Sequence, residues 1–432
     1  MVQLCRVTFY LRKRNKTNGK SLLSKILIVG LNFHPEPTGI GKYSGELAAY
    51  LAGQGHQVRV ITTPPYYPHW QVQQGYRAGR YQKEIWQGVE IQRCPLWVPR
   101  KPSGITRLLH LLSFAFSSFP VLLGQGCWRP NLILCIAPSF FNAPFALFTA
   151  RLCGAKAWLH IQDFELDAAT NLSMLPANHL ITKIAVWAEH GLLMRFDRIS
   201  TISNRMMARL SRKGVAPEKT FLFPNWVDTR LIFPLSVPQI SLKKELRIPD
   251  DKIIVLYSGN MGHKQGLENV IETARHLQAQ TKIHFVLCGD GALRSDLESD
   301  AQGLPNAQFL PLQPLEKLNQ LLNIADIHLL PQRADAADLV MPSKLSGMLA
   351  SGKAVIAAAN PGTEVAEIVG RLGVVMPPED APALAEAILA LIKDPGERAR
   401  LGHLGREYAC RYLEKEVILS KFMHAVEDLI KE

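Results

Sequence analysis

The sequence predicts an α/β protein with two doubly wound domains that face each other across a cleft. Short apolar runs end at glycines and are followed by helical patterns, in one series that starts at Lys25 and a second that starts at Ile253. Strands that alternate with helices in this way form parallel sheets. The 432 residues also exceed the length at which a single hydrophobic core usually stops growing.

Composition and pattern divide the chain into five parts. Residues 1–24 hold six basic residues and no acidic one, and we expect them to form an N-terminal extension. The apolar runs KILIVG, HQVRVITT, NLILCIAP and AKAWLHI place the first domain at residues 25–225. Residues 226–252 are rich in proline and charge, which is typical of a linker. The second domain then spans residues 253–407, and a helical pattern at 408–432 could pack back on the first domain.

The net charge of +12 is unevenly distributed. Up to Gln162 the chain has 19 lysines and arginines against 4 acidic residues, whereas the remainder has 30 against 33. Residues 91–162 contain no acidic residue, and the apolar run at 105–128 lies within them. This run is either a helix packed in the core of the first domain or a peripheral contact with an anionic membrane. Its histidine, serines and proline argue against a transmembrane span.

Other partners and cofactors are disfavoured by the sequence. Aromatic and basic residues are not interleaved as in nucleic-acid-binding proteins, so no nucleic-acid partner is expected. The seven cysteines show no CxxC pair and no metal-ligand spacing, which is typical of a reducing compartment. We therefore expect a cytoplasmic protein, with the inner face of the plasma membrane as the surface that the apolar run would contact.

Glycine-rich segments follow two of the apolar runs in the second domain and could cradle phosphate groups. Gly259 and Asn260 follow IIVLYS, and Gly289 and Gly291 follow HFVLC. Lys344 comes directly after Ser343 at a predicted helix start. A cation beside free backbone N–H groups favours a phosphorylated ligand, and these residues are therefore candidate ligands of a nucleotide phosphate.

Gly39 and Gly41 lie in a longer loop before the first predicted helix. Their spacing superficially matches a dinucleotide-binding fingerprint, but ten residues separate Val29 from Gly39, whereas the first glycine of that fingerprint ends its strand. We expect this loop to reach into the cleft and bind an anion of the donor. Helix capping and tight packing are the alternative interpretation.

Five segments, in their expected order, resemble retaining glycosyltransferases of family 4, which have the GT-B fold of two Rossmann-like domains. The segments are KILIVGLNFHPEPTGIGKYSGELAAYLAGQGHQVRVIT, then ISTISNRMMARLSRKGV with FLFPNWVD, then YSGNMGHKQGLENVIETA, FVLCGDGALRSDLE, and ADIHLLP with MPSKLSGMLASGKAVI. The resemblance covers nearly everything from Lys25 to the C-terminus. The variants NWVD, GNMGHKQG and PSKL resemble a branch of the family that serves surface-polysaccharide pathways.

The resemblance implies a hexosyltransferase-type enzyme of class EC 2.4. Such an enzyme transfers a sugar from a nucleotide sugar to a hydroxyl of a lipid-linked or oligosaccharide acceptor, with retention of configuration. It implies that the first domain binds the acceptor and the second the donor, without a cofactor or a bound metal. Two alternatives remain: a non-hydrolysing nucleotide-sugar epimerase of the same fold, and a non-catalytic nucleotide-sugar-binding protein.

The sequence departs from the family pattern at the donor site. A pair of glutamates is widespread in the family, and Leu339 and Gly347 stand at their positions. Asn260 stands where arginine is usual, and Gln265, with Lys264 beside it, where lysine is usual. We therefore expect Lys264 and Lys344 to contact the donor diphosphate.

Asp163 and His160 are the candidate catalytic residues. Gln162 stands where the family commonly has histidine near the end of the fourth strand, and Asp163 follows it, where an acceptor hydroxyl should enter. We expect Asp163 to orient or deprotonate that hydroxyl, with helix capping as the alternative. His160 lies on the same face of the strand and could equally be a packed histidine. Asp163, Glu165 and Asp167 could together hold a cation, although no metal is expected.

Overall fold

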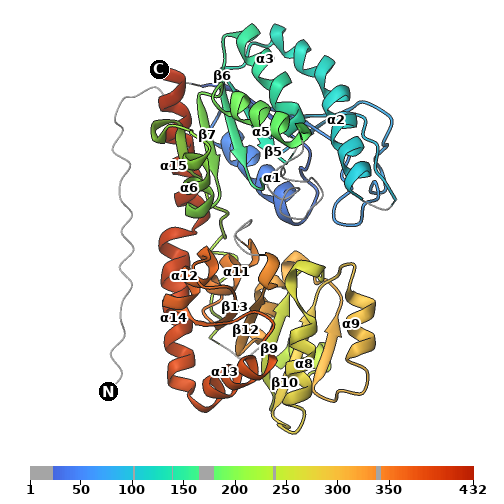
Figure 1. Ribbon diagram of the computed structural model, residues 1–432, viewed down its shortest axis with the longest axis vertical. Helices are drawn as coiled ribbons and strands as arrows, with labels where there is room; N and C mark the ends of the chain where they lie inside the picture. The colour runs from blue at the N-terminus through green and yellow to red at the C-terminus, as the bar shows by residue number, and fades with distance from the viewer. Residues whose placement is uncertain (1–22, 101–102, 139, 165–179, 237–239, 337–341) are drawn as a thin grey trace.

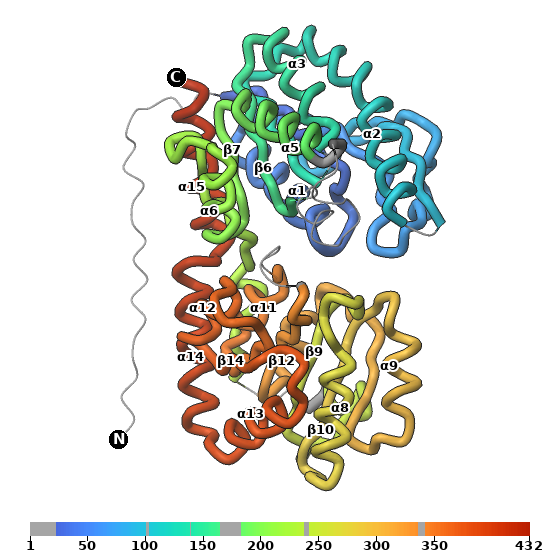
Figure 2. The backbone as a smooth tube through the Cα atoms, viewed as in Figure 1, coloured from blue at the N-terminus to red at the C-terminus, as the bar shows by residue number. Residues whose placement is uncertain are grey.

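The computed structural model describes residues 23–100, 103–138, 140–164, 180–236, 240–336 and 342–432. They form two α/β domains, one above the other in Figure 1, and the last two helices run along one side of both. The smooth trace in Figure 2 shows the same arrangement without side-chain detail. Each domain contains one mainly parallel sheet with helices on both faces, so the predicted fold class is confirmed.

The first domain is built on an eight-stranded sheet in the order β3-β4-β2-β1-β5-β6-β7-β8. Neighbouring strands are parallel except for β3 and β4, which pair antiparallel at one edge. The central strands are apolar on both faces because helices cover both. The strands span Lys25–Gly30 (β1), Gln57–Thr62 (β2), Gln82–Trp86 (β3), Val89–Arg93 (β4), Leu132–Ala137 (β5), Lys156–Ile161 (β6), Arg198–Thr201 (β7) and Thr220–Leu222 (β8).

The helices of the first domain cover the sheet unequally. One face packs against α1 and α15, and the other against α2, α3, α5 and α6. Only part of α2 is buried: Phe114 and Leu122 lie in the core, whereas Ile105 is 75% exposed and Phe116 67% exposed. These helices span Gly39–Gly53 (α1), Gly104–Gly124 (α2), Ala143–Cys153 (α3), Leu180–Leu193 (α5) and Asn204–Arg212 (α6).

The second domain contains a six-stranded, wholly parallel sheet in the order β11-β10-β9-β12-β13-β14. Its strands span Ile253–Ser258 (β9), Ile283–Cys288 (β10), Ala307–Leu310 (β11), Ile327–Pro331 (β12), Ala354–Ala358 (β13) and Val374–Met376 (β14). Its helices span Ile240–Glu245 (α7), Glu268–His276 (α8), Arg294–Asp300 (α9), Leu318–Ile324 (α10), Lys344–Ala350 (α11), Glu364–Leu372 (α12) and Ala381–Lys393 (α13).

The chain returns to the first domain through its last two helices. Helix α14 (Pro395–Tyr412) packs on the second domain, and α15 (Lys415–Lys431) packs on the first. Phe422 of α15 stacks on Phe223 with ring centroids 4.3 Å apart. The pattern at 408–432 therefore combines the end of α14 with a separate helix, because the chain bends at Leu413 and Glu414.

The predicted linker at 226–252 is too long, because its second half belongs to the second domain. Leu242 and Ile248 are each 2% exposed and pack in one cluster with Ile254 of β9. At the other end, Trp226 is buried in the core of the first domain. The proline and charge content of the segment masked the few apolar residues that anchor it.

A carboxylate of the second domain caps a helix of the first. Glu364, at the start of α12, accepts the backbone N–H groups of Asn204 and Arg205 at 3.0 Å each, and Arg205 pairs with Glu367. The free N–H groups in the first turn of a helix carry partial positive charge, which a carboxylate stabilises. This contact joins α6 to α12. It lies beside the place where the linker and the α14–α15 junction pass between the domains.

Candidate functional site

The loops after β9 and β10 pass so close together that they require glycine. A Cβ added at Gly289 would lie 1.9 Å from the carbonyl oxygen of Gly259, and one added at Gly291 would lie 2.4 Å from that of Met261. Gly259, Gly289 and Gly291 also have φ angles of 143°, 152° and 155°, which other residues rarely adopt. Gly259, Gly289 and Gly291 thus lie together at the carboxyl edge of the second sheet.

Lys344 lies beside the first of these loops and has no acidic partner among the residues that the structure describes. It begins α11, and its Nζ is 3.0 Å from the hydroxyl of Tyr257 and 4.2 Å from the centroid of that ring. Tyr257 donates its proton to the carbonyl of Asn260, so its oxygen accepts from the lysine. Lys344 keeps some exposed surface, but protein surrounds its ammonium, and this burial lowers the pKa of Lys344 to about 7.

Asn260 and Lys264 are exposed in the loop after β9. This loop is shaped by its own polar groups: Gln265 accepts the N–H of Gly262, and the carbonyl of Lys264 accepts the N–H of Arg333. Within the described chain, neither the Asn260 side chain nor that of Lys264 makes a hydrogen bond, so both are available to a ligand.

Asp163 approaches Lys264 from the first domain. It follows the end of β6 by two residues, and its Oδ1 is buried with no hydrogen-bond partner among the described residues. Burial raises the pKa of Asp163, while the charges of Lys264 and Arg107 oppose that rise. Because Lys264 follows β9 of the second domain, the carboxyl edges of the two sheets face each other at this point.

Two family models match the chain, and together they span most of it. The Glycosyl transferase 4-like domain matches residues 38–226, and the Glycosyl transferases group 1 model matches residues 238–408. The putative colanic acid biosynthesis glycosyl transferase WcaI of Escherichia coli (strain K12) is 43% identical over 410 residues, which cover 93% of this chain and 99% of that protein. The chain belongs to the family-4 glycosyltransferases, in the WcaI branch.

Solved structures of glycosyltransferases share this fold at low sequence identity. Sucrose-phosphate synthase from Thermosynechococcus elongatus superimposes with a TM-score of 0.73 at 19% identity, over 94% of this chain and 99% of that one. WaaG, a glycosyltransferase involved in lipopolysaccharide biosynthesis, gives 0.67 at 14% identity, over 93% of this chain and 99% of that one. These structures confirm the expected GT-B fold, and the family models with the WcaI relative confirm the expected transferase class.

His160 does not belong to the cleft of this glycosyltransferase. Its side chain is 3% exposed, with Nδ1 2.9 Å from the Ser200 hydroxyl and its ring 5.0 Å from that of Phe223. Burial lowers the pKa of His160 to about 3, so the imidazole stays neutral in the core. The catalytic assignment of His160 is replaced by the alternative interpretation, a packed histidine.

Gly39 and Gly41 have different roles in the loop before α1. A Cβ at Gly41 would lie 2.6 Å from the Cβ of Glu36, so tight packing explains this glycine. Gly39 has φ of 59° and open space around it, and no side chain caps α1 at Thr38. The amino end of α1 is therefore accessible to an anion at Gly39.

Glu36 and Tyr257 shape the two glycine loops, although no motif in the sequence marks either residue. Glu36 is 2% exposed, and its carboxylate accepts the N–H groups of Tyr66 and Tyr67 and an amide proton of Asn32. It thereby holds the loop before α1 in place. The local sequence carried no signal for either role, because both depend on contacts with distant segments.

The departures from the family pattern have partial structural explanations. Gly347 lies on α11, where an added Cβ would meet Leu322 of α10 at 3.5 Å, and Leu339 lies outside the described residues. Ser343 precedes α11 but does not cap it through its side chain. Among the described residues no group of three histidine, cysteine or acidic side chains could hold a metal ion; Glu165 and Asp167 lie outside them.

Replacing Lys344 by methionine should change how stability depends on pH. Burial places the folded-state pKa of Lys344 near 7, below the ordinary 10.5, so between these values the unfolded chain binds more protons and stability rises with pH. Lys344→Met removes this contribution, and the stability of wild type relative to the variant should rise by about 2 to 3 kcal/mol between pH 7 and pH 9.

Urea unfolding at both pH values measures this difference. The matched control is Lys282→Met, which removes an exposed lysine from the same domain and should leave the pH dependence unchanged. Parallel pH profiles for wild type and Lys344→Met would show that the ammonium is not buried.

Proposed function

We propose that this glycosyltransferase transfers a sugar from a nucleotide sugar to a lipid-linked or oligosaccharide acceptor, with retention, in exopolysaccharide or surface-polysaccharide biosynthesis. The observation that carries the proposal is the ammonium of Lys344, which lies beside the glycine loops and has no acidic partner among the residues that the structure describes. Lys264, in the loop after β9, is the cation of this domain whose charge acts on Asp163. The name of the Escherichia coli relative supports the pathway, and the Anabaena HepE structures with UDP and with UDP-glucose support the donor class.

The donor side of the reaction needs stabilisation of negative charge. When the bond between the sugar and the diphosphate breaks, charge grows on the phosphate oxygens. Lys344 and Lys264 supply cations, while Gly259, Gly289 and Gly291 allow the backbone to approach the phosphates closely. In this proposal these groups, and not a metal ion, carry the charge of the leaving group.

Asp163 would position the acceptor hydroxyl. Its buried Oδ1 has an open hydrogen-bonding position, and Lys264 across the cleft holds the donor phosphate near it. In a front-face retaining reaction the departing phosphate oxygen accepts the hydroxyl proton, so the enzyme base contributes little. Orientation then dominates the role of Asp163.

The proposal is tested with a panel of nucleotide sugars, with and without a lipid extract that contains polyprenyl-linked acceptors. We expect the sugar to move into the lipid fraction, with release of a nucleoside diphosphate and with the anomeric configuration kept. An altered nucleotide sugar formed without acceptor would identify an epimerase. Binding of a donor without turnover with any acceptor would identify a non-catalytic sugar-nucleotide protein.

Two substitutions of Asp163 separate positioning from proton abstraction. Asp163→Asn keeps the size and hydrogen-bonding capacity, whereas Asp163→Ala removes both. If Asp163 orients the hydroxyl, the alanine variant should lose about 100-fold in transfer rate, and the asparagine variant should lose far less. Donor binding, measured by calorimetry, should be intact in both; equal and near-complete loss of transfer would instead indicate a general base.

An apolar surface on α2 and α3 supports a peripheral position on the inner face of the plasma membrane. Phe116 and Phe148 are 67% and 49% exposed, and their rings lie near Phe145 and Phe119 in one aromatic group. Residues Gly104–Cys127 are long and apolar enough to cross a membrane by length and composition, and about a third of their most apolar window is buried within the domain. We infer that α2 lies on an anionic bilayer, with Arg107 beside it.

Flotation with phosphatidylglycerol vesicles tests this membrane contact. Wild type should float at low salt and less at high salt, because anionic lipids attract the basic surface. Phe116→Glu with Phe148→Glu should abolish flotation, while Leu315→Glu, at an exposed apolar residue of the second domain, should not. Equal flotation of all three proteins would exclude α2 and α3 as the contact.

A further inference from the structure

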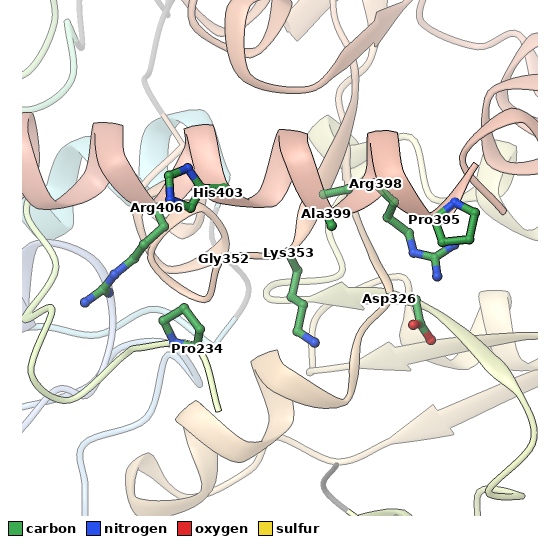
Figure 3. Close-up of a pocket in the computed structure, with 10 residues that line it drawn as sticks. Pro234, Asp326, Gly352, Lys353, Pro395, Arg398, Ala399, His403 and Arg406 are labelled. Atoms are coloured by element: carbon green, nitrogen blue, oxygen red, sulfur yellow. The ribbon is translucent and has the colours of Figure 1, made fainter. Parts of the chain in front are cut away.

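A cavity of about 400 Å³ lies at the amino edge of the second sheet, away from the donor loops (Figure 3). Asp326 precedes β12 and Lys353 precedes β13, so both mark the edge opposite Gly259 and Gly289. Helix α14 forms another wall through Arg398. The cavity is therefore separate from the cleft between the domains.

Basic side chains outnumber acidic ones around this cavity. Lys353, Arg398, His403 and Arg406 line it, against Asp326 as the acidic residue. The guanidinium of Arg406 donates to three backbone carbonyls of the linker and α11, so these hydrogen bonds occupy it. In Figure 3, Lys353 and Arg398 extend toward the side of the cavity that holds Asp326.

The positive charge of Lys353 and Arg398 is poorly compensated. Within the described chain, Lys353 has neither a side-chain hydrogen bond nor an ion pair, and Arg398 donates through Nη1 to a backbone carbonyl. Burial lowers the pKa of Lys353; Asp326 opposes this shift, and repulsion from Arg398 and Lys243 adds to it. An anion between the two side chains would relieve both the repulsion and the burial cost.

We propose that this cavity binds a sugar phosphate, with the phosphate between Lys353 and Arg398. A guanidinium and an ammonium are the side chains that proteins use most for phosphate groups. Asp326, whose Oδ2 accepts the N–H of Ile254, keeps Oδ1 for a hydroxyl of the same ligand. The volume is at the lower end of the range for small-molecule sites and exceeds what a bare phosphate requires.

The cavity lies beside the two segments that link the domains, namely the linker and α14. Pro234 of the linker packs against Gly352, where an added Cβ would lie 2.7 Å from the proline ring. Gly402 of α14 packs against the carbonyl of Gly352, where an added Cβ would lie 2.2 Å from the oxygen. A ligand held by Lys353 and Arg398 would thus bridge the sheet and α14 beside the linker.

Calorimetric titration with glucose 6-phosphate and with inorganic phosphate tests the site. Wild type should bind glucose 6-phosphate more tightly than phosphate, and Lys353→Gln with Arg398→Gln should weaken both by at least tenfold, about 1.4 kcal/mol. The matched control Arg400→Gln removes an exposed charge from α14 and should bind as wild type does. Equal affinity for the two ligands would overturn the assignment to a sugar phosphate.

A variant that should bind phosphate more tightly excludes misfolding as the cause of lost binding. Asp326→Asn keeps the hydrogen bond to Ile254 and removes the negative charge, so phosphate should bind more tightly than in wild type. Lys344→Met, which removes a proposed phosphate ligand from the donor cleft, should keep the wild-type affinity for glucose 6-phosphate. Loss of binding in Lys344→Met, or unchanged binding in the Lys353 and Arg398 double variant, would place the ligand in the donor cleft and overturn the proposal.

Discussion

The burial of the Lys344 ammonium against Tyr257 is the interaction on which the proposed donor site depends. Tyr257 links Lys344 to the loop after β9, because the hydroxyl that accepts from Lys344 donates to the carbonyl of Asn260. A Cβ at Gly259 would lie 3.3 Å from Cδ of Lys344, and the φ of 143° at this position would strain any residue other than glycine. A buried ammonium with no carboxylate beside it in the described part of the chain is costly in the free protein, and an anionic ligand would stabilise it.

The arrangement of the domains decides whether the Lys344 ammonium can lie close to an acceptor bound by the first domain, as proposed. Asp163 and Lys264 come from different sheets, and their mutual attraction requires the two carboxyl edges to face each other. That arrangement is held by the stacking of Phe422 on Phe223, by the bridge between Val227 and Glu414, and by Glu364 of α12, which caps the start of α6. The site therefore depends on contacts that lie along one side of the molecule.

Much of the architecture could be predicted, because it follows local rules. Apolar runs that end at glycine marked β9 and β10 and the close loops after them, where steric exclusion leaves glycine as the residue that fits. The linker was predicted too long, since Leu242 and Ile248 show their role through contacts with a strand that follows them. Glu36 could not be predicted for the same reason. Its carboxylate accepts from Asn32 and also from Tyr66 and Tyr67, about 30 residues further along the chain, and no local pattern indicates that these segments meet.

Fold class, family and the chemical groups on offer could be worked out from the sequence, since periodicity, glycine spacing and motif order are properties of the chain alone. Which of those groups can reach a ligand depends on the packing of distant segments. His160 and Asp163 are three residues apart, yet His160 is buried in the core against Ser200 and Phe223. Asp163 lies at the cleft, and its Oδ1 has no hydrogen-bond partner among the described residues. The physical reason is burial: solvation and charge partners come from packing between distant segments, and local sequence does not encode them.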